Sequence, residues 1–201
     1  MAAKPDRAGR YTLRFDDGSS MRLYRQTVED YALYAGLELT EEQVSILRTA
    51  AGQMSAKMRA VRIVTASAVS REDLQRRLIH KGEDPEQARQ AVQWMEDLSL
   101  VDDEKTAQQI VSRCASRGYG IGRAKQALYE KRIPKEYWDG ALADYPDQTE
   151  HILNFLRSRL TDGWEQRDLK RAIDALLRRG HSYTEIRQAL MRLDMDDFLE
   201  E

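Results

Sequence analysis

The sequence predicts a mainly α-helical fold in which tandem three-helix repeats of helix-turn-helix type form an elongated stack, behind a small N-terminal β-hairpin and its helices. Three observations support this fold class. An apolar pattern occurs three times at a spacing of about fifty residues, which is typical of stacked supersecondary units. Charged residues make up 33% of the chain and only four prolines occur, which favours helices with solvated outer faces. A short N-terminal stretch alternates between apolar and polar residues, as strands do.

The repeat is centred on Gly82, Arg132 and Gly180. A leucine precedes each centre by four residues, another apolar residue by three and a basic residue by one: Leu78, Ile79 and Lys81, then Leu128, Tyr129 and Lys131, then Leu176, Leu177 and Arg179. Apolar residues return six, nine, ten and thirteen positions after each centre, and alanine always holds the ninth. Such spacings form one buried stripe on a helix. We therefore expect an N-terminal module over residues 1–68 and repeats over residues 69–117, 118–162 and 163–201.

The N-terminal module begins with a hairpin pattern. Apolar residues alternate with polar ones on both sides of the turn sequence Asp16-Asp17-Gly18-Ser19, at Tyr11, Leu13, Phe15, Met21 and Leu23. An isolated hairpin is only marginally stable, so this one is expected to dock on the helices that follow. A short helix from Val28 is expected to end at Gly36, because glycine readily takes the left-handed conformation that closes many helices. Thr40-Glu41-Glu42-Gln43 has the form of a capping box, which predicts a longer helix running to Ala66.

The first repeat carries three helix starts. Ser70 caps a helix that is expected to end at Gly82, Asp84-Pro85 starts the second helix, and Asp102-Asp103 suits the N-terminus of a third. The apolar residues of the first helix are expected to face inward, and these are Leu74, Leu78 and Ile79.

The later repeats follow the same order with a shorter ending. The second is expected to run from Gly120 to Arg132 as a helix, to restart near Pro134 and to continue from Asp147. The third is expected to open after Gly163, to break at Gly180 and to restart with a capping box from Ser182 to Glu185. Its first helix should bury Leu169, Ile173, Leu176 and Leu177. An acidic tail then leaves no room for a further helix, and its members are Asp194, Asp196, Asp197, Glu200 and Glu201.

Composition indicates a soluble cytoplasmic protein. No stretch approaches the ~20 apolar residues needed to cross a bilayer, and the basic N-terminus lacks the apolar segment of a secretory signal. A single cysteine, Cys114, excludes an internal disulfide framework and favours a reducing compartment. The net charge of -2 excludes a uniformly basic nucleic-acid binder, although a local basic face is still compatible with it.

No catalytic, metal or cofactor site can be assembled from the sequence, so no enzyme activity is expected. Cys114 falls on the apolar side of its helix and is interpreted as a core residue, and Asp102-Asp103 as a helix cap rather than half of a metal site. The glycine-rich run 118–122 lacks the strand and the Lys-Ser/Thr pair of a phosphate loop, which favours a flexible joint between repeats. The three histidines have no partners at metal-ligand spacing and are interpreted as surface or helix-end residues: His80, His151 and His181.

Several runs occur in a fixed order: Ser70-Arg71-Glu72-Asp73-Leu74, Leu78-Ile79-His80-Lys81-Gly82, Leu100-Val101-Asp102-Asp103 with Ala107, Arg117-Gly118-Tyr119-Gly120, and Leu177-Arg178-Arg179-Gly180 with Tyr183 and Ile186. This ordered set resembles the RecX family, regulators of the RecA recombinase, over roughly residues 69–193. The N-terminal module is also similar to that of some members. Two features depart from the family pattern: Arg132 replaces the usual glycine, and Ala66-Ser67-Ala68-Val69 replaces basic residues that commonly precede the first repeat.

The resemblance implies a regulator without chemistry of its own. It implies tandem three-helix repeats that bind along the groove of the RecA filament on DNA and that modulate, mostly by inhibition, strand exchange and RecA-stimulated repressor cleavage in DNA repair and the SOS response. The partners expected are therefore the RecA filament and single- or double-stranded DNA, with no membrane, and a monomer is the simplest state.

Charge on helix faces supplies the candidate contacts. On a helical wheel centred on Leu169, the basic residues from 167 to 178 fall away from the buried stripe and Arg179 lies at its margin. Arginine suits paired contacts with carboxylate or phosphate. The candidate contacts to RecA or DNA are Lys81, Arg123, Lys125, Lys131, Arg132, Arg167, Lys170, Arg171, Arg178 and Arg179. The alternative function is a helix-turn-helix protein that binds DNA directly, against which stand apolar and acidic residues of its candidate recognition helix, such as Tyr137, Trp138 and Asp139.

Overall fold

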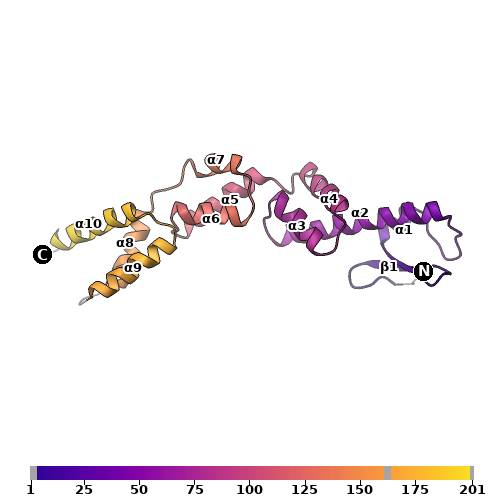
Figure 1. The fold of residues 1–201 in the computed structure, drawn as a ribbon, viewed down its shortest axis with the longest axis horizontal. Coiled ribbons are helices and arrows are strands. Elements are labelled where there is room, and N and C mark those ends of the chain that lie inside the picture. The colour runs from indigo at the N-terminus through magenta and orange to yellow at the C-terminus, as the bar shows by residue number, and fades with distance from the viewer. Residues whose placement is uncertain (1–3, 161–163, 200–201) are drawn as a thin grey trace. The chain divides into compact units, whose positions relative to one another are not determined.

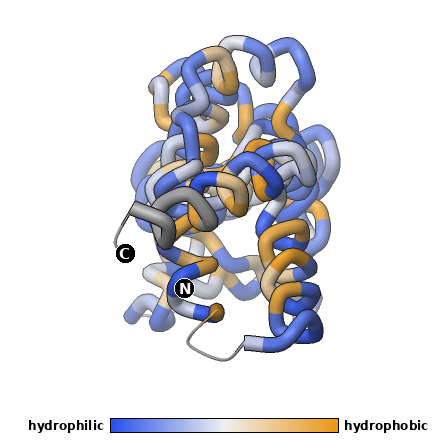
Figure 2. The backbone as a smooth tube through the Cα atoms, turned by 90° about the vertical axis from the view of Figure 1, so that its left-hand side faces the viewer, coloured by the Kyte–Doolittle hydropathy of each residue, from blue (hydrophilic) through white to orange (hydrophobic). Residues whose placement is uncertain are grey.

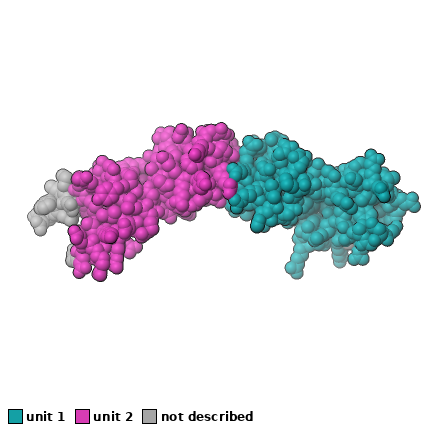
Figure 3. Space-filling view, in the orientation of Figure 1, with its two compact units in different colours: residues 1–101 teal, residues 102–201 magenta. Residues whose placement is uncertain are grey.

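The computed structural model of the chain describes residues 4–160 and 164–199, with side chains described up to Leu193. The fold is mainly helical with one two-stranded antiparallel sheet near the N-terminus (Figure 1), as predicted. Contacts divide the chain into two compact units, residues 1–101 and residues 102–201 (Figure 3). In the part of the chain that the structure describes, no helix is both long and apolar enough to cross a membrane.

Unit 1 begins with the predicted hairpin. Strands β1 (Arg10–Arg14) and β2 (Ser20–Tyr24) pair antiparallel, with Tyr11 opposite Leu23. Leu13 and Leu23 are buried in one cluster with Leu47 of the long helix α2 (Glu41–Ala66). The prediction that the hairpin docks on this helix is therefore confirmed.

The helix between hairpin and α2 was placed wrongly by the sequence pattern. Helix α1 spans Arg25–Asp30, so it begins before Val28 and ends well before Gly36. Ala32 takes the left-handed conformation with φ of 46° and closes the helix, while Gly36 turns the following loop. By contrast, α2 begins and ends as predicted.

The capping box of α2 is closed in both directions. The amide of Gln43 donates to Thr40 Oγ1 at 3.2 Å, and the amide of Thr40 donates to Gln43 Oε1 at 2.9 Å. Two of the amide groups near this helix end are thus satisfied by side chains.

Helices α3 (Arg71–His80) and α4 (Pro85–Asp97) pack against the second half of α2. Both begin at their predicted caps, because the amide of Asp73 donates to Ser70 Oγ at 3.1 Å and Asp84 Oδ1 accepts from the amide of Glu86 at 3.0 Å. The core between the three helices combines small residues of α2 with larger ones of α3 and α4, and its members include Ala56, Ala60, Leu74, Leu78, Ala91 and Met95.

Unit 2 holds two further groups of helices. Helices α5 (Asp103–Ser116) and α6 (Ile121–Glu130) share a core with the short η1 (Lys135–Tyr137) and α7 (Trp138–Leu142). Helices α8 (Thr149–Arg159), α9 (Gln166–Arg178) and α10 (Tyr183–Leu199) share another. The predicted capping box opens α10, whose backbone continues through Asp194, Asp196 and Asp197. Gly163, Glu200 and Glu201 lie outside the described residues.

In each repeat, a left-handed turn separates two helices. These two helices pack together with the helix that precedes them in the chain. Thus α2 packs with α3 and α4, α5 with α6 and α7, and α8 with α9 and α10. Hydrophobic and hydrophilic residues alternate along the tube of the chain (Figure 2), as expected for helices with one buried side. The repeat boundaries before residues 69, 118 and 163 stay a prediction from the sequence pattern. The predicted repeats begin with α3, α6 and α9, whereas the packed groups begin one helix earlier, with α2, α5 and α8.

The same backbone turn closes the first helix of every pair. The centre of each repeat is left-handed, with φ of 89° at Gly82, 56° at Arg132 and 85° at Gly180. The residue after each centre donates its amide to the carbonyl of the leucine five positions before it, from Glu83 to Leu78 at 3.1 Å, Ile133 to Leu128 at 3.0 Å and His181 to Leu176 at 3.2 Å. These bonds form a Schellman motif. The three leucines are therefore equivalent, as the repeat predicts.

Arg132 provides a test of this turn, because a side chain with a Cβ atom is disfavoured in the left-handed region. We expect Arg132→Gly to have a higher free energy of unfolding than Arg132→Ala by about 1 kcal/mol. Both variants remove the arginine side chain and its contacts, so their difference isolates the backbone. Urea titration followed by circular dichroism measures it, and an alanine variant as stable as the glycine variant would show that the turn is not strained.

Candidate partner-binding surface

Each repeat exposes an apolar side chain directly after its buried leucine. Leu78, Leu128 and Leu176 are buried, whereas their neighbours are 40% exposed at Ile79, 73% at Tyr129 and 43% at Leu177. The prediction that Ile79 and Leu177 face inward is therefore wrong. The buried stripe runs through the residue four positions before each leucine, at Leu74, Ala124 and Ala172, and the next residue is turned about 100° away from it.

A basic residue stands two positions after each exposed apolar residue. Lys81 and Arg179 are exposed and Lys131 is half-buried, and each follows the end of its helix. We call the three combinations the helix-end pairs: Ile79 with Lys81, Tyr129 with Lys131, and Leu177 with Arg179. The guanidinium of Arg179 lies 4.6 Å from the centre of the Phe155 ring, so a cation–π contact holds it in place.

The basic residues predicted on α9 are exposed. Arg167 lies 3.7 Å from Glu165, and Arg171 lies 3.5 Å from Asp168. Such surface ion pairs contribute little, so these side chains are available to a stronger partner. Arg167 and Lys170 also border a shallow hollow of about 570 Å³, whose other lining residues are Gln166, Leu169, Ile173 and Tyr183. Lys170 and Arg178 are exposed on the same helix.

The basic residues around α6 are spread over the helix. Arg123 pairs with Glu130 at 3.1 Å, and Lys125 is exposed in the middle. Lys131 and Arg132 are half-buried after its last turn. Lys81 belongs to unit 1. The nine predicted residues of unit 2 are thus distributed over the α6 and α9 regions.

Close backbone contact joins the start of α6 to the end of α9. The amide of Gly120 donates to the carbonyl of Arg179 at 3.0 Å, and that of Gly122 donates to the carbonyl of Gly180, also at 3.0 Å. A Cβ atom on Gly120 would lie 2.2 Å from the Gly180 oxygen, and one on Gly180 would lie 2.1 Å from the amide nitrogen of Arg123. The glycine-rich run is therefore a packed joint, and the expectation of a flexible one is wrong. It brings the backbones of Arg123 and Arg179 together.

His181 is buried in this joint. Its Nε2 lies 3.1 Å from the carbonyl oxygen of Gly118, and its Nδ1 is buried without a hydrogen-bond partner in the described part of the chain. Burial lowers the pKa of His181, so the neutral imidazole is favoured in the folded chain. Of the two positions that the sequence allowed, surface or helix end, His181 takes the helix end and is buried there. The residue after each repeat centre is buried in all three repeats. In the second repeat this residue is the apolar Ile133, which could have indicated from the sequence that the equivalent His181 is buried too.

The predicted roles of Asp102 as a helix cap and of Cys114 as a core residue are confirmed. Asp102 Oδ1 accepts from the amide of Lys105 at 2.9 Å, which caps α5 and lowers the pKa of Asp102. Cys114 is buried, and burial raises the pKa of its thiol. Among the described residues, no three His, Cys, Asp or Glu side chains gather where they could hold a metal ion.

Comparison with known proteins identifies the family. No protein-family model matches the chain. The regulatory protein RecX of Xanthomonas axonopodis pv. citri is 32% identical over 145 residues, which cover 69% of this chain and 87% of that protein. The chain belongs to the RecX family. The RecX protein of Vibrio campbellii is 25% identical over 146 residues, covering 71% of this chain and 94% of the relative.

Solved structures of RecX proteins share the fold. A crystal structure of regulatory protein RecX matches with a TM-score of 0.66 and 22% identity, covering 93% of this chain and 98% of the other. RecX from Lactobacillus salivarius matches with a TM-score of 0.63 and 20% identity, covering 73% of this chain and 99% of the other.

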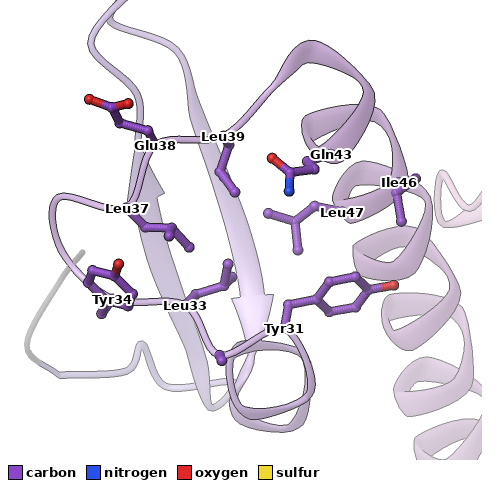
Figure 4. A pocket seen from close by; sticks show the side chains of 10 residues that line it. Tyr31, Leu33, Tyr34, Leu37, Glu38, Leu39, Gln43, Ile46 and Leu47 are labelled. Carbon is purple, nitrogen blue, oxygen red and sulfur yellow. The ribbon is translucent and has the colours of Figure 1, made fainter.

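An apolar hollow in unit 1 was not found from the sequence. It has a volume of about 480 Å³ and lies between the loop after α1 and the start of α2 (Figure 4). Tyr31, Tyr34 and Ile46 border it and are more than two-fifths exposed. None of the ten candidate basic residues lines this hollow, and the charged residue among those that line it is Glu38.

The packed joint predicts a sharp difference between two glycines. We expect Gly120→Ala to lower the free energy of unfolding of unit 2 by about 2 kcal/mol, because the added Cβ forces α6 away from the Gly180 carbonyl. Gly140→Ala is the matched control, since Gly140 lies in α7 with open space around its Cβ position. Alanine there should raise stability by about 1 kcal/mol. Urea titrations that give both variants the same stability would contradict the close contact.

Proposed function

We propose that this RecX-family protein regulates RecA by binding a RecA filament on DNA through its helix-end pairs, assisted by the basic residues of α9. It acts by occupying the filament and carries out no chemistry. The observation that carries the proposal is the threefold occurrence of an exposed apolar residue with a basic neighbour, at Ile79, Tyr129 and Leu177. Relatives named regulatory protein RecX support a regulatory role.

The chemistry of the helix-end pairs favours a protein partner. An exposed Ile, Tyr or Leu gains from contact with an apolar surface, whereas DNA phosphates offer it no such contact. The basic member of each pair suits a carboxylate on the partner. A neutral or acidic protein surface therefore matches both members better than a nucleic-acid backbone alone.

Repetition of the pairs favours a partner that is itself repetitive. A filament presents the same surface on each subunit, so equivalent side chains from different repeats can find equivalent sites. Once one repeat is bound, the next binds at a high effective concentration, and modest contacts add to a firm attachment. A stable interface should bury upward of ~1,000 Å² in total.

Occupancy of the filament groove would explain regulation. A bound chain would exclude the second DNA strand and would alter filament growth or disassembly, which inhibits strand exchange and repressor cleavage. The basic face of α9, with Arg171 and Arg178, would add contacts to acidic protein groups or to DNA. Because its partner is RecA, we expect the chain to act in the cytoplasm. One chain presents several repeats, so it can bind the filament as a monomer.

Co-sedimentation with RecA assembled on single-stranded DNA tests the proposal. We expect the double variant Tyr129→Ala with Leu177→Ala to weaken filament binding by about tenfold or more, because truncation of central contact residues typically costs over 1 kcal/mol each. Leu98→Ala with Leu100→Ala is the matched control, since these leucines are 49% and 53% exposed but lie outside the helix-end pairs. Inhibition of strand exchange should fall in parallel with binding.

Two outcomes would contradict the proposal. The unaltered chain could fail to sediment with RecA filaments at moderate salt, or the two double variants could bind equally well. Binding to bare DNA that matches binding to the filament would favour the direct DNA-binding alternative instead.

A further inference from the structure

Unit 1 contains a basic cleft. It has a volume of about 510 Å³ and is lined by residues of the N-terminal strands, the second half of α2 and the end of α3. We call it the cationic cleft. Its charged lining residues are Arg10, Arg59, Arg62, Arg77 and Lys81, and no carboxylate is among the described residues that line it. Like charges this close repel one another, so an anion that enters the cleft would lower their electrostatic energy.

Three of the arginines that line the cleft form ion pairs with carboxylates that do not line it. Asp6 lies 2.8 Å from Arg10, Asp73 lies 2.8 Å from Arg77, and Glu83 lies 2.7 Å from Arg59. Glu83 is buried, and it also accepts from Ser55 Oγ at 3.1 Å. Five cations with three paired carboxylates leave a charge of +2 (5 minus 3) around the cleft. A guanidinium carries five N–H donors, so a single carboxylate on one side leaves donors for a ligand on the other.

The remaining two cations are exposed. Neither Arg62 nor Lys81 pairs with a carboxylate in the part of the chain that the structure describes, although Arg62 Nη2 donates to the carbonyl of Ala8 at 3.3 Å. Arg59 donates to the carbonyl of Lys81, which ties the end of α3 to α2. The cleft is therefore built by secondary structure and ion pairs, while its two outermost charges are unneutralised.

Beside the cations, the cleft offers an aromatic and apolar surface. Tyr24 lines it from β2 and is half-buried, and Ile63 and Ala66 line it from α2. Anions without an aromatic part, such as the side chains of an acidic peptide, would leave this surface unused. A nucleotide unit combines a phosphate with a flat base, and base stacking on tyrosine is available only when the base is unpaired.

From this combination we infer that the cationic cleft binds the sugar–phosphate backbone of single-stranded nucleic acid, with a base against Tyr24. The inference gives unit 1 a binding role of its own, and the cleft shares Lys81 with the first helix-end pair. It is tested without RecA, so its failure and the failure of the proposed function are distinguishable.

Fluorescence anisotropy of the full chain with a labelled 15-nucleotide oligothymidylate tests the inference. We expect Arg62→Glu to weaken binding about tenfold, because it replaces a charge-assisted contact by repulsion. The slope of log affinity against log salt concentration should shrink by about 0.7, the value for one phosphate contact on a single strand. Tyr24→Leu should weaken binding while it leaves this slope unchanged, since stacking releases no counterions.

Arg48→Glu is the matched control. Arg48 is exposed on the same helix, and fourteen residues separate it from Arg62, or about 21 Å along the axis. Thermal unfolding of each variant shows whether the hairpin still docks. Equal loss of binding in the Arg62 and Arg48 variants would overturn the inference. So would tighter binding to a 15-base-pair duplex, or complete displacement of the oligonucleotide by a glutamate decapeptide at equal charge concentration, which would assign the cleft to an acidic protein segment.

Discussion

The left-handed turn after each buried leucine is the constraint on which the rest of this structure depends. It reverses the chain at Gly82, Arg132 and Gly180, and its hydrogen bond back to the leucine carbonyl fixes where the next helix starts. The alanine nine residues later is then small enough for close packing of the second helix, and Ala91 and Ala189 are fully buried as a result. The turn also sets what faces outward. With the leucine fixed in the core, the next residue must point away, and this produces the exposed member of each helix-end pair.

The position after each turn shows how one backbone site accepts different chemistry. Ile133 fills it with an apolar side chain, Glu83 with a carboxylate that pairs with Arg59, and His181 with a neutral imidazole against the Gly118 carbonyl. Each is buried, and each polar one has a partner close by. In unit 1 that partner helps to build the cationic cleft. In unit 2 it lies in the glycine-packed joint. The same turn, repeated in the chain, thus supports different local surroundings in the two units.

Local signals in the sequence predicted most helix starts, because caps act through contacts within three residues. Thr40 with Gln43, Ser70 with Asp73, and Ser182 with Glu185 all close as expected. The errors arose where distant contacts decide. Gly36 is a good helix end by type, yet Ala32 closes α1 first. Gly120 looks flexible by composition, yet the Gly180 carbonyl covers it. The cationic cleft joins residues from three elements, so no spacing within one helix could indicate it, although the sequence did single out Lys81. The exposure of Ile79 was missed because apolar residues were assumed to be buried. Buried residues are mostly apolar, but many apolar residues lie on the surface.

Regulation of RecA in the way we propose requires that the repeats meet a RecA filament with equivalent surfaces. Electron cryomicroscopy of the chain bound to RecA on single-stranded DNA would test this most directly. We expect density for the chain in the filament groove, with the ends of α3, α6 and α9 turned toward RecA subunits and Ile79, Tyr129 and Leu177 in contact with them. Filaments without added density, or a chain attached through the opposite sides of these helices, would contradict it.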